Sequence, residues 1–496
     1  MTEEKSSYRQ LFKATTVFGG VQILTIVISI IRSKFIAVLL GPTGMGIVGL
    51  LNSTTGFIDA LTNFGIERSA VKNIAVVYGT NDPKLISKII LVLRRLVWGT
   101  GLLGALITLF LSSYLSKIAF GNEEYTFAFI WLSVTLLLTQ LTSGEKAVLR
   151  GLRKIKFIAK TSLWGALSGL IVSIPLYYFF SLKGIVPAII LTAITTLLVT
   201  VYYSRKISFD SVKIKKNDYF TEGKDMLKMG FFLSLSSLIA LGASYLVRIF
   251  IRYIGTVDDV GFYSAGFAIV NAYFGVFFTS LTTDYYPRLA SVASDNNKAR
   301  ILMNQQSELS VLIIAPVLTI FLIFINAIVI ILYSKDFVPI NDMILWASLG
   351  IYFKAASYAL GIIFISKGDV KTLFWSDLLS NIFMFGLNLI GFKYLGLEGL
   401  GISFLISFIF MFLLTFFIVR FKYSFYYSSQ FFKVFFLQLS LGIIAFILAR
   451  LINKPLNYYL GVLVILISVW YSIKQLDRRM GLLIIAKKFI SNKLKS

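Results

Sequence analysis

Long apolar runs separated by short polar stretches fill the chain from residue 12 to residue 474. A helix needs about 20 apolar residues to cross the hydrocarbon core of a bilayer, and the runs repeatedly reach that length. The first two cover residues 12–31 and 36–62. This pattern predicts an all-α polytopic membrane protein with about fourteen transmembrane helices. The polar stretches between the runs are too short to hold a soluble domain.

Composition supports a membrane location, because 57% of the 496 residues are hydrophobic and the mean hydropathy is +0.82. Lysine and arginine total 48 against 23 acidic residues, and the excess gathers in alternate polar stretches. Cytoplasmic loops carry such an excess, so both chain termini are expected in the cytoplasm. A nucleic-acid partner is not expected, since it would require a basic, aromatic-rich face on a soluble domain.

The chain contains neither cysteine nor histidine. Disulfides, thiolate chemistry and the usual zinc and haem ligands are therefore excluded. We expect no cofactor and no metal site, and we expect that the protein is not an enzyme.

An internal repeat recurs at an offset of about 215 residues. "RSKFIAVLLGPTGMGIV" is matched by "RIFIRYIGTVDDVGFY", which pairs Arg32 with Arg248 and Gly46 with Gly261. Each copy contains six predicted spans, an even number, so both copies enter the membrane in the same direction and can enclose a central cavity. The predicted organisation is a six-helix lobe (1–210), a basic cytoplasmic linker (211–227), a second six-helix lobe (228–425), two additional transmembrane helices (426–475) and a basic cytoplasmic tail (476–496).

Two six-helix lobes, "GPTGMG" opening the second helix, and the later "IGTVDDVGFYSAG" and "YYPRLA" carry a resemblance to a known family. The chain resembles the polysaccharide-transport branch of the multidrug/oligosaccharidyl-lipid/polysaccharide exporter superfamily, and most of all the Wzx-type O-antigen flippases. The resemblance implies a flippase in the bacterial inner membrane. Its substrate would be an undecaprenyl-pyrophosphate-linked oligosaccharide, moved from the cytoplasmic to the periplasmic leaflet by alternating access. A polysaccharide polymerase and glycosyltransferases would be possible partners.

The two additional helices depart from the twelve spans of many such flippases. In the related lipid II flippases an extra pair helps to form a groove for the lipid tail, and the Phe-rich "FFKVFFLQLSLGIIAFILA" suits that role. A peripheral pair facing lipid is an equal alternative, because lipid-facing helices are also rich in Phe and Leu.

Cations within or beside the spans are costly and are therefore candidates for binding the substrate pyrophosphate. Four of them form the first group: Arg32 and Arg248 occupy equivalent places in the two repeats, and Lys34 and Arg252 lie close by. Guanidinium groups bind phosphate oxygens bidentately, most strongly in a cavity of low dielectric constant. Lys354, near the middle of a span, is a fifth candidate. The alternative for the first four is that they reach the outer lipid headgroups.

Polar side chains at helical spacing suggest contacts with sugar hydroxyls or a polar cavity wall. Asn52 and Asp59 lie on one predicted span, and Asn271 lies at the place in the second repeat that matches Gly56 of that span. Asp377 and Asn381 share a face of another span. Asp377 is also a possible ion-pair partner of Lys354, and small polar residues of this kind can equally hold helices together.

Gly41 and Pro42 interrupt the helical pattern close to Arg32. Proline removes a backbone hydrogen bond, so the pair either forms a hinge or is simply the turn between the first two spans.

The principal alternative is a multidrug or small-molecule exporter of the same superfamily. Such exporters are expected to carry a carboxylate in the first helix, whereas residues 12–31 contain none. A cation-rimmed cavity would also repel cationic drugs. A membrane glycosyltransferase would require a larger extracytoplasmic loop than the sequence offers.

Overall fold

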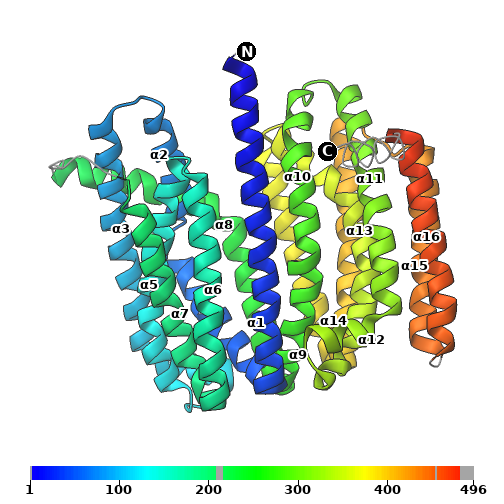
Figure 1. Cartoon of the computed structure of the whole chain (residues 1–496), viewed down its shortest axis with the longest axis horizontal. Coiled ribbons are helices and arrows are strands. Elements are labelled where there is room, and N and C mark those ends of the chain that lie inside the picture. Colours follow the sequence, from blue (N-terminus) through cyan, green and yellow to red (C-terminus); the bar gives the residue numbers. More distant parts are fainter. Residues whose placement is uncertain (1–2, 208–215, 453–454, 481–496) are drawn as a thin grey trace, which may run out of the picture. The chain divides into compact units, whose positions relative to one another are not determined.

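The computed structural model describes residues 3–207, 216–452 and 455–480, and in these ranges the chain is helical without strands (Figure 1). The elements follow one another in this order: α1 (Glu3–Thr62), α2 (Ile66–Tyr78), α3 (Pro83–Phe110), α4 (Ser112–Phe120), α5 (Thr126–Gly151), α6 (Ile155–Phe180), η1 (Ser181–Gly184), α7 (Ile185–Ser204), α8 (Lys216–Ile254), α9 (Val257–Phe267), the π-helix η2 (Ala268–Tyr273), α10 (Phe274–Ser291), α11 (Asn296–Ile323), α12 (Ile325–Leu332), η3 (Lys335–Ile340), α13 (Asn341–Ser366), α14 (Val370–Tyr423), α15 (Ser429–Leu451) and α16 (Leu456–Met480).

Ten helical stretches of the described residues are long and apolar enough to cross a membrane. Three of them are as long as two crossings, namely Gly20–Thr62, Ile155–Ser204 and Val370–Tyr423. The all-α polytopic prediction is therefore confirmed, while the number fourteen stays a prediction.

Two glycines break the longest helices. At 1.5 Å per residue, α1 would be about 90 Å long if it were straight, which is three times the hydrocarbon thickness. Gly41 interrupts it with φ 66° and ψ −167°, and Gly396 interrupts α14 with φ 57° and ψ −137°. A side chain clashes with the backbone in this region, so glycine is required at both breaks.

The contacts divide the chain into two compact units. Unit 1 comprises Met1–Gly261 with Leu332–Ser334, and unit 2 comprises Phe262–Ile331 with Lys335–Ser496. The division assigns α8, the first helix of the predicted second repeat, to unit 1. The lobe, linker and tail boundaries stay predictions, and residues 208–215 and 481–496 of the linker and tail lie outside the described range.

Within unit 1, α3 packs on α5, and α6 packs on α7 and α1 (Figure 1). An apolar core joins α2, α3 and α5 through residues such as Ile74, Val92 and Ala147, all with no exposed surface. This packing fixes α1, α5 and α7 as the walls of the polar cavity described below.

Within unit 2, α13 packs on α14, and α11 packs on α13, α15 and α16. A buried polar network joins the last two helices: the Gln438 amide donates to the Ser472 hydroxyl at 2.8 Å, and Ser468 donates to Gln438 at 2.7 Å.

The Phe-rich start of α15 has two faces. Phe431 is buried and stacks on Tyr427, with ring centres 3.8 Å apart, whereas Phe436 is 58% exposed. Part of the aromatic run therefore holds α15 in unit 2, and the other part is available to lipid. The groove and the peripheral pair both stay predictions for this segment.

Candidate functional site

One cavity of unit 1 gathers the polar faces of three helices, and we call it the Arg32 cavity. Its volume is about 530 Å³. The polar lining residues come from α1, α5 and α7: Ser29, Arg32, Ser33, Asn52, Thr139, Thr142, Ser143, Lys146, Thr192 and Thr196. Two predicted site residues, Arg32 and Asn52, therefore share one cavity.

Helical periodicity explains why these side chains converge. Thr139, Thr142, Ser143 and Lys146 follow the i, i+3, i+4, i+7 spacing of one helix face on α5. The sequence interpretation missed Lys146 as a cavity residue because it lies near the predicted end of a span. The polar spacing on α5 is the signal that could have found it.

Arg32 lies deeper in its helix than its sequence pattern suggests. The helix continues past the predicted end at residue 31 and breaks only at Gly41, so Arg32 precedes the break by about 14 Å of helix. Gly169 on α6 lies beside its side chain, since an added Cβ would lie at the ordinary contact distance of 3.6 Å from Arg32 Nη1. The guanidinium is therefore close to α6 as well as to Thr192 of α7, which lines the same cavity.

The cavity holds positive charge without a matching acid. Within the described residues Arg32 has neither a hydrogen bond nor an ion pair, and its Nε is buried. Lys146 interacts electrostatically with Glu67, which does not line the cavity, and the buried Thr192 hydroxyl lacks a hydrogen-bond partner among the described residues. Uncompensated buried charge is costly, so two cations beside an unpaired hydroxyl favour the binding of an anion.

The other three predicted cations of the first group lie in unit 1 but do not line this cavity. Arg248 on α8 donates to the carbonyl oxygen of Ser244 at 2.9 Å. Arg252 donates through Nη2 to the carbonyl oxygen of Phe120, at the end of α4. Lys34 on α1 is half-buried and absent from the cavity lining. Their predicted role in binding pyrophosphate stays a prediction.

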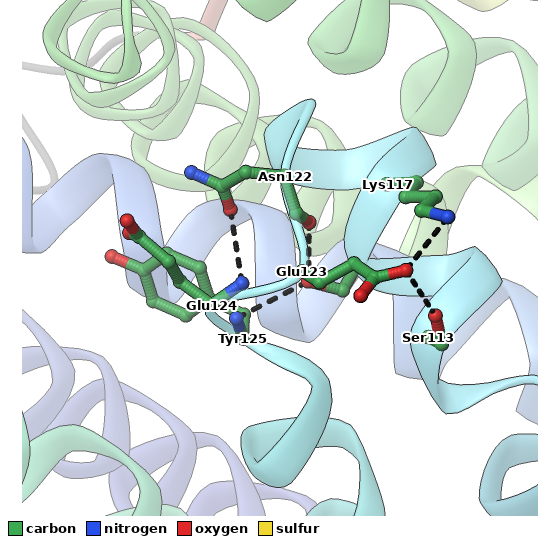
Figure 2. Close-up of polar contacts among 7 residues, drawn as sticks. Ser113, Lys117, Asn122, Glu123, Glu124 and Tyr125 are labelled. Carbon is green, nitrogen blue, oxygen red and sulfur yellow. Dashed lines mark hydrogen bonds and ion pairs between the residues drawn. The ribbon is translucent and has the colours of Figure 1, made fainter.

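The turn that receives Arg252 is itself tightly bonded, as Figure 2 shows. Glu123 pairs with Lys117 at 2.6 Å and accepts from the Ser113 hydroxyl at 3.0 Å. The hydrogen bond from Lys117 lowers the pKa of the Glu123 carboxyl. This turn holds the end of α4 in place, where the helix dipole favours a cation such as Arg252.

A second, smaller polar cavity in unit 1 surrounds Asp59. Its volume is about 150 Å³, and Ser143 lines both it and the Arg32 cavity. The Gln140 amide donates to Asp59 at 2.7 Å, and the Asn63 amide donates at 3.4 Å. Asp59 therefore has neutral hydrogen-bond donors rather than a cation as direct partners.

The predicted polar residues of unit 2 are arranged differently from the sequence hypothesis. The Lys354–Asp377 ion pair is not formed: the Lys354 ammonium lies 5.3 Å from the ring centre of Phe278 and 5.1 Å from that of Phe408. Two aromatic faces thus hold the ammonium on α13, away from the carboxylate. Asn381 donates to the backbone oxygen of Asp377 at 2.8 Å. The side chain of Asn271, within η2, lies outside the described residues.

Another ion pair joins α5 to α3. Arg94 donates two hydrogen bonds to Glu145, at 2.8 and 2.9 Å, which joins α3 to α5. The bidentate pair removes Glu145 as a counterion for its neighbour Lys146, whose side chain lines the Arg32 cavity.

Equivalent segments of the two repeats cross at the Gly41 break. A Cβ on Gly46 would lie 2.0 Å from the carbonyl oxygen of Val257, and one on Gly261 would lie 2.0 Å from that of Pro42. Thr43 donates to Asp258, 215 residues later, at 2.6 Å. Contacts that are reciprocal at one offset are those expected from a twofold relation between repeats. Gly41 breaks α1 beside this crossing, and the choice between a hinge and a turn at Gly41 and Pro42 stays a prediction.

The sequence of this chain is similar to those of several transporters. A family model described as polysaccharide biosynthesis protein matches residues 35–342. A putative O-antigen transporter of Shigella flexneri is 24% identical over 310 residues, which cover 61% of this chain and 72% of that protein. The lipid III flippase of Escherichia coli (strain K12) is 20% identical over 370 residues, covering 73% of this chain and 86% of the flippase.

Solved structures share the fold. The lipid II flippase MurJ in an inward closed conformation has a TM-score of 0.67 at 13% identity, covering 93% of this chain and 99% of that one. An inward-facing multidrug resistance MATE family transporter of the MOP superfamily has a TM-score of 0.65 at 14% identity, covering 82% and 96%. The predicted superfamily resemblance is confirmed, and these relatives are named as transporters and flippases rather than enzymes. The family match spans more than half of the length of this chain, so this multi-pass membrane protein belongs to the polysaccharide biosynthesis protein family.

Proposed function

We propose that the protein is a flippase for an undecaprenyl-pyrophosphate-linked oligosaccharide in the bacterial inner membrane, with both termini in the cytoplasm. The observation that carries the proposal is the Arg32 cavity, where Arg32 has no hydrogen bond or ion pair among the described residues and lies with Lys146 beside the unpaired Thr192 hydroxyl. A pyrophosphate would supply the missing anion. The threonine and serine hydroxyls would donate hydrogen bonds to the first sugar or accept hydrogen bonds from it. The relatives named as an O-antigen transporter and a lipid III flippase support the same substrate class.

The mechanism would be alternating access of the cavity to the two leaflets. Arg32 and Lys146 would bind the pyrophosphate in place of water, since fixed cations in a site of low dielectric constant attract it more strongly than bulk solvent does. Moving an anion outward would gain about 2.3 kcal/mol per charge per 100 mV of membrane potential. Proton coupling through Asp59 or Asp377 is the alternative driving force. Glycosyltransferases would build the substrate before this step, and a polymerase would act on it afterwards.

The test is leaflet-resolved analysis of the lipid-linked oligosaccharide in cells that depend on this protein. Arg32→Ala and Lys146→Ala should each leave the lipid on the cytoplasmic side, whereas Arg32→Lys should keep part of the activity because it keeps the charge. Arg478→Ala is the matched control, since this exposed arginine on α16 lies outside the cavity. Normal flipping by both alanine variants, at normal abundance in the membrane, would refute the assignment of the cavity.

Export of small molecules is the second candidate, because a multidrug transporter shares the fold. The charge of the cavity separates the two candidates. Vesicles containing the protein should not concentrate cationic dyes, and uptake of such a dye that survives Arg32→Ala would favour the exporter.

A further inference from the structure

A cavity at one end of unit 2 belongs to no function assigned so far, and we call it the Asn457 cavity. It encloses about 710 Å³ where η3, the start of α13, the end of α15 and the start of α16 meet. Its polar lining residues come from four helices: Asn326, Asn341, Asp342, Arg450, Asn457 and Tyr458. Its volume lies in the range of small-molecule sites, about 300–1,000 Å³.

The amides of this cavity leave hydrogen-bonding capacity unused. Asn341 donates to Asn326 at 3.2 Å, which leaves the Asn341 Oδ1 without a donor among the described residues. Asn457 is 4% exposed, and its Oδ1 also lacks a donor there. Buried amide oxygens are normally satisfied, so two unsatisfied ones on one cavity indicate a partner that supplies hydroxyl donors.

Local charge argues against an anionic ligand. Arg450 is paired with Glu398 at 2.6 Å, and Glu398 also accepts from the Trp346 indole at 2.9 Å. Asp342 is exposed and has no ion-pair partner among the described residues. Of the two charged lining residues that the structure describes, the basic one is therefore paired and the acidic one is not, the opposite of the Arg32 cavity. A phosphate or pyrophosphate would be repelled.

We propose that the Asn457 cavity binds a neutral saccharide. Asparagine amides, a carboxylate and a guanidinium are groups that donate to and accept from vicinal hydroxyls, and the apolar floor of Ile323, Val338 and Leu345 suits the C–H face of a sugar ring. The proposal does not depend on the proposed flippase activity. The ligand can be the glycan of a transported lipid or a free sugar.

Trp346 supplies a reporter of occupancy. The guanidinium of Arg450, which lines the cavity, lies 5.5 Å from the centre of the Trp346 ring. The chain has six tryptophans, so replacement of the other five by Phe leaves this one as the single emitter. The full-length single-tryptophan protein in lipid nanodiscs would be titrated with glucose, galactose, N-acetylglucosamine and lactose, and separately with inorganic phosphate.

At least one neutral sugar should change the emission of Trp346 saturably, and phosphate should not. Asp342→Ala and Asn326→Ala should each weaken that binding by about tenfold, the loss expected for one removed hydrogen bond in a preformed site. The matched control Asn297→Ala, an exposed residue at the start of α11, should bind as the parent does. Equal thermal midpoints of the variants would show that folding is retained.

Three results would overturn the proposal: no sugar changes the emission, the change survives both cavity variants, or phosphate binds more tightly than the neutral sugars. The first would mean that water alone fills the cavity. If sugar binding holds, flipping assays with Asp342→Ala then identify the source of the ligand. Slower flipping points to the glycan of the lipid, and unchanged flipping points to a free sugar, with the binding result standing in either case.

Discussion

Replacing Gly46 by alanine should destabilise unit 1, because the backbones of α1 and α9 cross there without room for a side chain. The added Cβ would lie 2.0 Å from the Val257 carbonyl oxygen, whereas real contacts of this kind begin near 3.0 Å. The two helices would have to separate by about 1 Å, and overpacking of that kind costs roughly 1–3 kcal/mol. The separation would also stretch the hydrogen bond from Thr43 to Asp258, worth about 1 kcal/mol.

A gain opposes these losses, since alanine is favoured over glycine inside a helix by about 0.5–1 kcal/mol. The net expectation for Gly46→Ala is a loss of about 2 kcal/mol in the free energy of unfolding. Gly56→Ala in the same helix is the matched control. No atom lies within 4 Å of its added Cβ, so only the gain applies and the variant should be slightly more stable than the parent.

Reversible denaturation of the purified protein in mixed micelles would measure the difference, with tryptophan fluorescence as the readout. Gly261→Ala should cost about as much as Gly46→Ala, since its added Cβ would lie 2.0 Å from the Pro42 carbonyl oxygen. The double variant should cost less than the sum, because one separation of the helices relieves both clashes. Equal stability of Gly46→Ala and Gly56→Ala would refute the close crossing.

Three further predictions concern ion pairs and buried hydrogen bonds. Gln438→Ala should lower the free energy of unfolding by about 1–2 kcal/mol, because it leaves two buried serines of α16 without their amide partner. An unchanged denaturation midpoint would contradict the network. Arg94→Met should lower the free energy of unfolding by about 3 kcal/mol, because it leaves Glu145 without its ion-pair partner. The double variant Arg94→Met with Glu145→Leu should recover most of that stability in the same assay. Hydrogen bonds from Lys422 and Tyr423 lower the pKa of Asp369, so its stabilising effect is complete above the unfolded value of about 4 and is lost as the pH falls through the lower folded pKa. The difference in thermal midpoint between pH 7 and pH 3 should therefore be smaller in Asp369→Asn than in the parent.

The helical membrane fold could be predicted from the sequence because a 20-residue apolar run has few alternatives in a bilayer. The sequence also marked the break at Gly41 and Pro42, but the predicted end of the first span did not coincide with it. The pattern ended that span at residue 31, since a charge ordinarily ends an apolar run, whereas the helix continues through Arg32 to the break at Gly41. A cation can lie within a membrane-spanning helix when its side chain lines a polar cavity, and apolar periodicity along the sequence does not predict where cavities lie.

The cavity lining could be predicted only in part. Arg32 and Asn52 stood out as polar residues within or beside spans, but Lys146 did not, because it lies near the predicted end of a span and directly follows the acidic Glu145. In the structure Glu145 forms an ion pair with Arg94 on the neighbouring helix α3, and this pairing depends on how α3 and α5 pack. Pairing across helices is set by tertiary contacts, which is also why the expected Lys354–Asp377 pair is absent.

The two predicted repeats share a close backbone crossing, but their equivalent arginines have different partners. At the turn, both copies keep the small residues that allow a close crossing, so Gly46 and Gly261 have reciprocal contacts. At the equivalent arginines the copies differ: Arg248 donates to the Ser244 of its own helix, whereas Arg32 has no hydrogen bond or ion pair within the described residues. A backbone crossing tolerates no larger side chain and must be kept in both copies, but a binding site needs its uncompensated charge only once. From this asymmetry we expect the proposed anion binding of unit 1 on the Arg32 side of the repeat, which is the side that the alanine variants of the flipping assay probe.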